Sequence, residues 1–344
     1  MKENVIEKKE MKILLVGTAD LSGNTIGGQL EKTKNVYNEL RTRNVDLTFC
    51  NMFELGTGIK MIMHFVFHYF KNDSIVVITS NRGTRFMIEA VSFLKKILKR
   101  KVVFLIVGNQ VDYLSGFSSS KLRNVDCYYF EVDEMKNRIG KDIKAGFLSN
   151  CKKIQETDID YQAQTIKHIC YYSEISYRKG FDTIVAALDK VNKESKKYQL
   201  DVYGFFAETE KRELQTLCDG KDYICFKGTI KREETVHVLS QYLFMVFPSR
   251  HKLEGVPGAI VDSYEAGVPV ICSDIAYLPY IVTNGKTGFL YHEEKELIDI
   301  LNRIADDDTD ILSFRKNCRM EAEKYNIISA VDLLLNDLQN LKIR

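Results

Sequence analysis

Two carboxylates frame a short, glycine-rich turn in the C-terminal half of the chain. Glu254 stands directly before this turn, and Asp262 follows Glu254 after a gap of seven residues. The turn consists of Gly255, Val256, Pro257, Gly258 and Ala259. Glycines let the backbone approach a ligand closely and proline pre-sets a helical turn, so several N–H groups and the positive end of a helix dipole point at one place. Such a place suits phosphate or diphosphate, and the two carboxylates suit sugar hydroxyls.

The alternative is a structural role, in which the two acids only cap and solvate the start of a helix. The neighbouring sequence favours a binding site, because apolar runs at 243–247 and 268–272 enclose the turn. The order of strand, loop, helix and strand is half of a parallel α/β unit. Further β-rich runs alternate with helical patterns, at 12–16, 45–49, 75–79, 102–107, 167–172, 200–205 and 223–226. This alternation predicts an α/β protein with doubly wound parallel sheets.

Length and composition describe an ordinary globular protein with more than one domain. A chain of 344 residues is long enough for two domains with complete cores. Hydrophobic residues make up 45% and charged residues 28%, and the net charge of +2 gives no reason to expect nucleic-acid binding. The sequence becomes polar and loses its periodicity between 149 and 165. We therefore predict an N-terminal domain at 1–155, a second domain at 156–322 and a final helix at 323–344.

The eight cysteines predict a reduced, cytoplasmic protein. They lie mostly within or beside apolar runs, and none forms a Cys-x-x-Cys pair. This distribution favours buried thiols over zinc ligands or a disulfide framework. The first ten residues are highly charged and have no apolar core, so no signal peptide is expected. The apolar runs are all shorter than the roughly 18 residues that a membrane span needs.

The stretch from Glu254 to Asp274 resembles the signature of the retaining glycosyltransferases of family 4. That signature is an acid, seven residues, a second acid, a helix of small residues and then Gly-x-Pro-Val-Ile. Here the helix ends at Gly267 and the following strand opens at Pro269. The second acid is Asp262, where Glu is more common in the family. The resemblance implies the GT-B fold: two Rossmann-like domains facing across a cleft, the donor nucleotide mainly on the C-terminal domain, the acceptor mainly on the N-terminal one, and a last helix that crosses back to the N-terminal domain.

A second part of the resemblance lies at the first strand of the C-terminal domain. A basic residue before Gly-Phe-Asp reaches the donor diphosphate in the family, and Lys179 fills that position with Arg178 beside it. The family usually carries an additional Arg five residues earlier, where this chain has Glu174. An acid there would repel a diphosphate unless Arg178 neutralises it or the loop takes another route. Without the resemblance, Arg178 and Lys179 would be interpreted as solvated residues before a helix.

Two glycine-containing turns resemble further donor contacts of the family. Gly27 and Gly28 resemble the N-terminal glycine loop that borders the donor phosphates, although a plain tight turn fits them equally well. Their spacing from Gly23 does not match the dinucleotide fingerprint Gly-x-Gly-x-x-Gly. Gly228 and Ile230 occupy the strand end that lies near the nucleotide base in the family.

The resemblance implies a retaining hexosyltransferase that moves a sugar from a nucleotide-sugar, with a UDP-sugar favoured, to a glycan or lipid-linked glycan in cell-surface polysaccharide assembly. Lys179 and the helix start at 255–259 would stabilise the leaving phosphate without a metal or another cofactor. Glu254 would orient the hydroxyls of the transferred sugar, and Asp262 those of the ribose. Two alternatives remain open. One is a nucleotide-sugar epimerase or hydrolase on the same fold, and the other is a non-catalytic donor-binding subunit of a transferase complex.

Three features of the N-terminal half stay open as well. The loops 80–85 and 109–121 follow strand ends and are candidates for acceptor contact. His64 and His68 lie one helical turn apart and could bind a metal, but their aromatic surroundings favour core or interface positions. A helix predicted at 85–98 ends in a basic segment, 95–101. This segment either complements the helix dipole or makes a peripheral contact with the anionic cytoplasmic face of a membrane.

Two of the predicted helices carry an apolar stripe. The helix predicted at 85–98 presents Met87, Ala90, Val91, Leu94, Ile97 and Leu98 on one side. The last helix presents Ile327, Val331, Leu334, Leu338 and Leu341. Because the stripe of the last helix must be buried against something, and because the last helix of the family crosses back, we expect it on the N-terminal domain.

Overall fold

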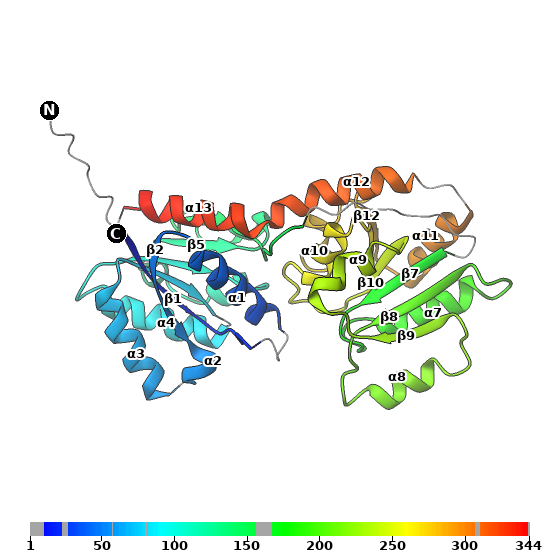
Figure 1. Ribbon diagram of the computed structural model, residues 1–344, viewed down its shortest axis with the longest axis horizontal. Coiled ribbons are helices and arrows are strands. Elements are labelled where there is room, and N and C mark those ends of the chain that lie inside the picture. Colours follow the sequence, from blue (N-terminus) through cyan, green and yellow to red (C-terminus); the bar gives the residue numbers. More distant parts are fainter. Residues whose placement is uncertain are drawn as a thin grey trace. The chain divides into compact units, whose positions relative to one another are not determined.

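The chain forms two compact units, each built on one parallel sheet (Figure 1). The computed structural model describes residues 10–22, 27–56, 58–79, 81–155, 167–306 and 310–342. Unit 1 is Met1–Lys153 with Asn326–Arg344, and unit 2 is Ile154–Tyr325. Gly23 and most of the polar segment predicted at 149–165 lie outside the described residues. The last helix belongs to unit 1, which resumes at Asn326, three residues after the predicted limit at 323.

Unit 1 contains a six-stranded sheet with the strand order β2-β1-β3-β4-β5-β6. All neighbouring strands pair in parallel. The strands are β1 (Met11–Gly17), β2 (Val45–Asn51), β3 (Ser74–Ile78), β4 (Lys101–Leu105), β5 (Cys127–Phe130) and β6 (Ala145–Phe147). The helices are α1 (Gly28–Arg41), α2 (Met52–Leu55), α3 (Ile59–Lys71), α4 (Asn81–Leu94), α5 (Val111–Leu114), α6 (Ser119–Leu122), the 3₁₀ helix η1 (Asp133–Arg138) and α13 (Ile327–Asn340).

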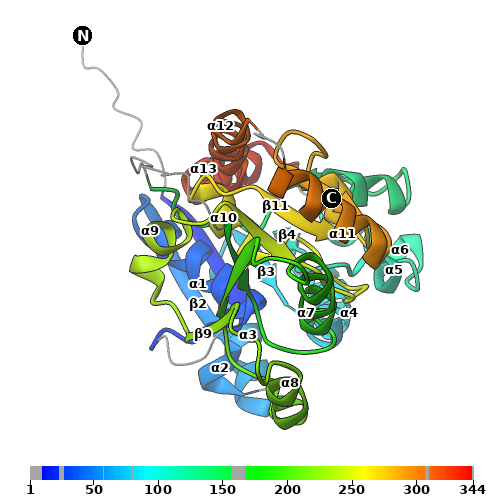
Figure 2. The same cartoon turned by 90° about the vertical axis from the view of Figure 1, so that its right-hand side faces the viewer.

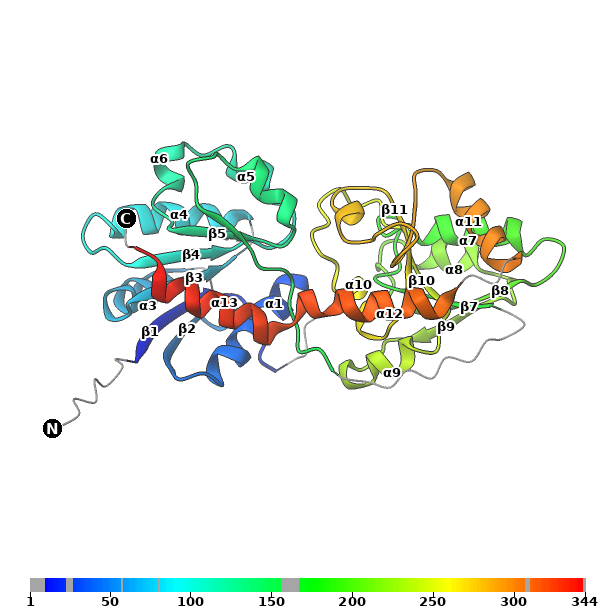
Figure 3. The same ribbon diagram turned by 90° about the horizontal axis from the view of Figure 1, so that it is seen from above.

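Helices cover both faces of this sheet. In β1, Ile13 and Leu15 belong to a core shared with α1 and α13. Leu14 and Val16 are equally buried and, because strand side chains alternate, they face the opposite side. Right-handed crossovers place α3 and α4 on that opposite face (Figure 1). The last helix therefore packs on unit 1, as predicted, where it covers the sheet, and Figure 3 shows α13 beside α1.

Unit 2 repeats this architecture with the strand order β12-β11-β10-β7-β8-β9. Its strands are β7 (Lys167–Tyr172), β8 (Tyr198–Tyr203), β9 (Ile224–Gly228), β10 (Phe244–Phe247), β11 (Val270–Ser273) and β12 (Gly288–Tyr291). Its helices are α7 (Phe181–Val191), α8 (Lys211–Leu217), α9 (Thr235–Leu239), α10 (Gly258–Glu265), α11 (Glu294–Asp306) and α12 (Ile311–Ala322), with the short 3₁₀ helices η2 (Arg232–Glu234), η3 (Leu278–Tyr280) and η4 (Glu323–Tyr325). Figure 2 is the view in which helices α7 and α11 face the reader.

In each sheet, successive strands are added first toward one edge and then toward the other. In unit 2 the strands β7, β8 and β9 follow one another toward one edge, and β10, β11 and β12 toward the other. The reversal lies between β7 and β10, which are paired neighbours. Ligands of open α/β sheets bind beyond the carboxyl ends of the strands at such a point. In unit 1 the corresponding point lies between β1 and β3.

These sheets confirm the predicted α/β class with two doubly wound parallel sheets. Strands β5 and β6 were not predicted, because runs of four and three residues are too short to show a periodic pattern. The helix predicted at 85–98 is wrong at both ends, since α4 begins at Asn81 and ends at Leu94. After Leu94 the backbone continues in tight turns, with the Ile97 N–H donating to the Leu94 carbonyl. This turn rotates Ile97 outward to 62% exposure, away from the buried Met87, Val91 and Leu94 with which the predicted helix aligned it.

Candidate functional site

Two loops leave the carboxyl ends of the neighbouring strands β7 and β10 and touch one another. The loop after β7 ends at Gly180, which has a φ of +71°. A Cβ atom added there would lie 1.8 Å from the carbonyl oxygen of Pro248, the first residue of the loop after β10. Only glycine fits both this backbone conformation and this close approach. The two loops are therefore held together at the reversal point of unit 2.

Lys179 and Glu254 meet at this junction. The Lys179 ammonium forms an ion pair with Oε1 of Glu254, and the Ser249 hydroxyl donates to the same oxygen at 2.9 Å. The Lys179 nitrogen also lies 5.5 Å from the centre of the Phe247 ring. The Lys179 and Glu254 side chains are 15% and 9% exposed, so the pair is largely buried but still accessible to solvent. An anion could replace Glu254 beside the lysine while Ser249 continues to hold the carboxylate.

Arg178 neutralises Glu174, which resolves the question left open by the sequence. A guanidinium nitrogen of Arg178 lies 3.0 Å from a Glu174 carboxylate oxygen. Partial burial raises the pKa of Glu174, but hydrogen bonds from Arg178 and Ser176 and the charges of Arg178 and Lys179 outweigh it and lower the pKa overall. Glu174 is therefore ionised, and Arg178 balances its negative charge. Lys179 is not the only cation that interacts with this carboxylate.

Arg250 ties the loop after β10 to the start of α7. Its guanidinium bonds to both carboxylate oxygens of Asp182, at 3.0 and 2.9 Å, and to the Thr183 hydroxyl at 2.6 Å. Its backbone N–H donates to the Arg178 carbonyl at 2.9 Å. Sequence analysis missed this residue. A cation immediately after the strand-ending Pro248-Ser249 was the available signal, but its partner lies 68 residues away in the chain.

His251 is the next residue of the same loop. Its N–H donates to the Ser249 hydroxyl at 3.2 Å, and its carbonyl accepts from the Glu254 N–H at 3.1 Å. Burial lowers the pKa of His251; the Glu254 carboxylate opposes this shift, and the charges of Arg178 and Lys179 reinforce it. The imidazole is consequently neutral near pH 7 and adds no charge to the site.

The start of α10 is open to a ligand. Pro257 caps the helix in an extended conformation, and Gly258 is its first residue. A Cβ atom added to Gly258 would meet no atom within 4 Å. Gly255, Val256 and Pro257 are buried, whereas Gly258 is exposed and Ala259 is half-buried. The positive end of the helix dipole therefore faces accessible space, as a phosphate site requires.

Asp262 faces the end of β7 from within α10. Burial raises the pKa of Tyr172, the last residue of β7, and the charge of the hydrogen-bonded Asp262 carboxylate raises it further. Asp262 is half-buried. The structure thus brings Lys179, Glu254 and Asp262 to the carboxyl ends of β7 and β10, beside the start of α10.

The remaining predicted site residues lie elsewhere. Gly228 ends β9 with a φ of +78°, and the half-buried Ile230 follows it at the same edge of the sheet, on the far side of β8. Gly28 is the first residue of α1 in unit 1, and Gly27 caps that helix in an extended conformation. Open space surrounds the position of a Cβ atom on Gly28.

The described residues contain no group of three or more His, Cys, Asp or Glu side chains placed to hold a metal ion. The rings of His64 and His68 lie 4.4 Å apart on α3, and both residues are half-buried. Burial lowers the pKa of His68, and the neighbouring charges of His64 and Lys71 lower it further. All eight cysteines are free thiols, and six of them are buried, as their apolar neighbours predicted.

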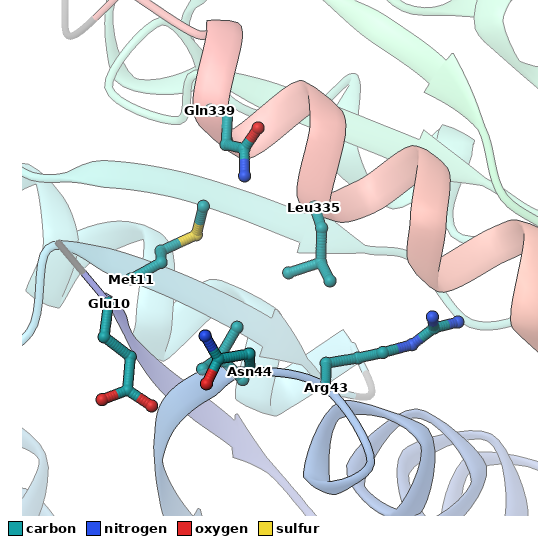
Figure 4. A pocket seen from close by; sticks show the side chains of 7 residues that line it. Glu10, Met11, Arg43, Asn44, Leu335 and Gln339 are labelled. Atoms are coloured by element: carbon teal, nitrogen blue, oxygen red, sulfur yellow. The ribbon is translucent and has the colours of Figure 1, made fainter. Parts of the chain in front are cut away.

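A separate cavity of about 410 Å³ lies in unit 1 (Figure 4). Side chains from the amino-terminal ends of β1 and β2 and from α13 line it: Glu10, Met11, Arg43, Asn44, Val45, Leu335 and Gln339. It occupies the edge of the sheet opposite the carboxyl ends of the strands, and its lining includes none of the predicted site residues. We therefore assign no chemistry to it.

The two doubly wound units and their last helix have the GT-B fold. Residues 156–325, which make up nearly all of unit 2, match the family model described as glycosyl transferases group 1. A structure of HepE from Anabaena in complex with UDP has a TM-score of 0.71 at 16% identity, over 96% of this chain and all of that one. The apo form of the lipopolysaccharide outer core galactosyltransferase WaaB has a TM-score of 0.71 at 13% identity, over 96% of this chain and 99% of that one.

Two curated relatives match parts of the sequence. The alpha-monoglucosyldiacylglycerol synthase of Streptococcus pneumoniae is 29% identical over 133 residues, which are 38% of this chain and 30% of that protein. An uncharacterized 41.2 kDa protein in the cps region of Klebsiella pneumoniae is 21% identical over 212 residues, 61% of this chain and 54% of that protein. The chain thus spans about a third to a half of the length of these relatives.

Proposed function

We propose that the protein is a retaining glycosyltransferase that moves a hexosyl group from a UDP-sugar to a glycan or lipid-linked glycan. The observation that carries this proposal is the Lys179–Glu254 pair beside the open start of α10, at the reversal point of unit 2, with Asp262 of the same helix bonded to Tyr172 at the end of β7. A cation and a helix start suit a diphosphate, and the carboxylates suit sugar hydroxyls. In this proposal unit 2 binds the donor and unit 1 binds the acceptor.

The mechanism follows from the ion pair. Donor binding separates Lys179 from Glu254, so that the ammonium contacts the diphosphate and the carboxylate accepts hydrogen bonds from the transferred sugar. Asp262 accepts from the ribose hydroxyls. As the bond between the anomeric carbon and the phosphate oxygen breaks, Lys179 and the α10 N–H groups stabilise the charge that develops on UDP. The acceptor oxygen bonds to the anomeric carbon on the same face, and its proton passes to a phosphate oxygen of the leaving UDP.

Three comparisons support the choice of substrates. Structures of the Anabaena protein HepE are complexes with UDP and with UDP-glucose, which favours a UDP-sugar donor. The Streptococcus pneumoniae relative is named as a synthase of a glycosylated diacylglycerol, and the Klebsiella pneumoniae relative is placed in a cps region. These names favour a lipid-linked or surface-glycan acceptor. We place the reaction on the cytoplasmic side of the membrane, without a metal or another cofactor.

A donor screen and two variants test the site. UDP-glucose, UDP-galactose and UDP-N-acetylglucosamine are first compared by thermal shift, because a bound donor raises the melting temperature. Lys179→Ala and Glu254→Gln should each lower transfer by at least about 100-fold, the effect of removing one charge-stabilising group, while circular dichroism stays unchanged. Lys221→Ala is the matched control, because it breaks a surface ion pair with Asp189 in the same unit. Transfer at the wild-type rate in either site variant would refute the assignment.

The products separate the remaining alternatives. Retention is read from the anomeric configuration of the product by NMR. A hydrolase or epimerase would convert the UDP-sugar without an acceptor. A non-catalytic subunit, to which the departures at Glu174 and Asp262 give some weight, would show a thermal shift with UDP-sugars but release no UDP with any acceptor.

A further inference from the structure

The outward face of α3 in unit 1 is apolar and exposed. Ile59, Met63, Phe67 and Phe70 recur at a spacing of four, four and three residues and are 70%, 66%, 55% and 38% exposed. Their spacing places them on one side of the helix. The inner side is buried through Met61, Phe65 and Tyr69. A surface helix normally presents polar residues to solvent, so this outer stripe is not explained by the packing of unit 1.

The neighbouring helix α4 extends this surface. Phe86, Phe93 and, just beyond its end, Ile97 are 38%, 64% and 62% exposed. Hydrogen bonds join the end of α3 to the segment that follows α4, since the Tyr69 hydroxyl donates to the Leu98 carbonyl at 3.0 Å and Arg100 donates to the Phe70 carbonyl at 2.8 Å. Both views of unit 1 show α3 and α4 on the same side of its sheet (Figures 1 and 3). We call these seven side chains the outer apolar face: Ile59, Met63, Phe67, Phe70, Phe86, Phe93 and Ile97.

Positive charge borders the outer apolar face. Helix α3 contains no Asp or Glu, and its exposed lysines are Lys60 and Lys71. The Lys71 ammonium lies 3.8 Å from the centre of the Phe67 ring, so cation and aromatic residue occupy the same side of the helix. The segment after α4 adds the exposed Lys96 and Lys99.

Two acids near this face are engaged with cations. Asp73 lies 3.7 Å from Arg100, and Glu89 lies 2.5 Å from Lys121. An apolar surface bordered by lysines is complementary to an anionic lipid bilayer. The apolar side chains enter the boundary between headgroups and acyl chains, and the lysines contact the anionic headgroups.

We propose that the outer apolar face docks unit 1 on an anionic lipid bilayer, with α3 lying in the plane of the headgroups. At 13 residues α3 is about 20 Å long, shorter than the roughly 30 Å hydrocarbon core. Among the described helices, none has the length and apolar character that crossing a membrane requires. The helix therefore lies on the bilayer. This docking extends the contact predicted at 95–101 to α3, and it goes beyond the proposed transfer reaction because it needs neither donor nor acceptor.

Vesicle binding by the full chain tests this surface. Co-sedimentation is measured with vesicles of phosphatidylcholine alone and with vesicles that also contain phosphatidylglycerol. The wild type should bind the anionic vesicles more tightly, and this preference should weaken with salt. Met63→Ser combined with Phe67→Ser should lower binding about tenfold or more, because two large apolar side chains no longer enter the bilayer. Lys60→Glu combined with Lys71→Glu should lower it to a similar extent.

The control replaces two exposed apolar side chains by serine on the other unit. Leu312 and Met320 on α12 of unit 2 are 70% and 65% exposed, as Ile59 and Met63 are on α3. Leu312→Ser combined with Met320→Ser should therefore leave vesicle binding unchanged. Equal binding by the Met63 and Phe67 variant and the wild type would refute the proposal, and so would a wild type that does not sediment with anionic vesicles.

A fluorescence measurement reports the contact directly, because the sequence contains no tryptophan. Phe67→Trp keeps a large aromatic side chain and should give an emission that shifts to the blue on addition of anionic vesicles. Leu312→Trp should not shift. Size-exclusion chromatography tests the alternative occupant. If the wild type is a dimer and the Met63→Ser, Phe67→Ser variant is a monomer, the face binds a second copy of the chain and the lipid proposal is wrong.

Discussion

Each unit brings a lysine and a glutamate together near the carboxyl ends of its strands, but the two pairs differ in burial and place. In unit 1 the Lys32 ammonium lies 3.0 Å from Glu131 and also donates to the Ile106 carbonyl. The second Glu131 oxygen accepts from the Gly108 N–H at 3.0 Å. These side chains are only 1% and 3% exposed. In unit 2, Lys179 and Glu254 are several times more exposed.

The position in the sheet explains why the pairs serve different purposes. Lys179 and Glu254 come from loops after β7 and β10, the two strands that flank the reversal point. Glu131 instead follows β5, away from the reversal between β1 and β3. The buried pair of Lys32 and Glu131, in which both carboxylate oxygens accept hydrogen bonds, fixes α1 to the sheet of unit 1. A partly open pair beside a helix start can exchange its partner for a ligand.

The largest expected effect comes from breaking the buried pair. Lys32→Met leaves the Glu131 carboxylate buried without its cation, which should lower the free energy of unfolding by about 3–5 kcal/mol. Lys179→Met should cost much less stability, because its partner stays bonded to Ser249 and solvent is near. Urea unfolding of both variants gives the comparison.

The double variant Lys32→Met with Glu131→Leu is the control. Replacing both charges by apolar side chains should recover most of the lost stability. A Lys32→Met protein as stable as the Lys179→Met protein would show that the two pairs do not differ as their burial indicates. UDP binding, measured by calorimetry, should be lost in Lys179→Met and kept in the double variant.

A smaller effect is expected at the glycines of the two units. Gly180→Ala places a Cβ atom against the Pro248 carbonyl at a positive φ, so we expect a loss of about 2–3 kcal/mol and weaker UDP binding as the loops separate. Gly28→Ala meets open space in the first turn of α1 and should leave stability unchanged or slightly higher. Thermal unfolding gives the melting temperatures of both variants. A Gly180→Ala protein with the melting temperature of the wild type would contradict the close approach of the two loops.

The smallest effect concerns the pH dependence of the Glu174–Arg178 pair. Because the folded protein lowers the pKa of Glu174, the pair stabilises the fold above the ordinary glutamate pKa of about 4.3, and this contribution disappears as the pH falls through the lower folded-state pKa. Solvent screening limits it to a fraction of a kcal/mol. Wild type and Glu174→Gln should therefore differ in urea midpoint at pH 6, begin to converge near the ordinary glutamate pKa of about 4.3 and coincide only at lower pH. A difference that grows as the pH falls would have the wrong sign.

The sequence by itself determined the class of fold and suggested part of the candidate site. Apolar runs of five or six residues that alternate with helical patterns specify parallel α/β units, because strand and helix periodicity are local properties. The acids and glycines at 254–262 could likewise be predicted, since they stand together in the chain between two apolar runs, whereas Lys179 was predicted only from the resemblance to a family.

Only the tertiary structure decided which charges meet. Lys179 and Glu254 are 75 residues apart and Lys32 and Glu131 are 99 apart, and no local pattern distinguishes an open pair from a buried one. The clamp between Arg250 and Asp182 and the outward turn of Ile97 were decided in the same way. The physical reason is that the order of strands in a sheet fixes which loop ends are neighbours, and burial then sets how strongly their charges are held.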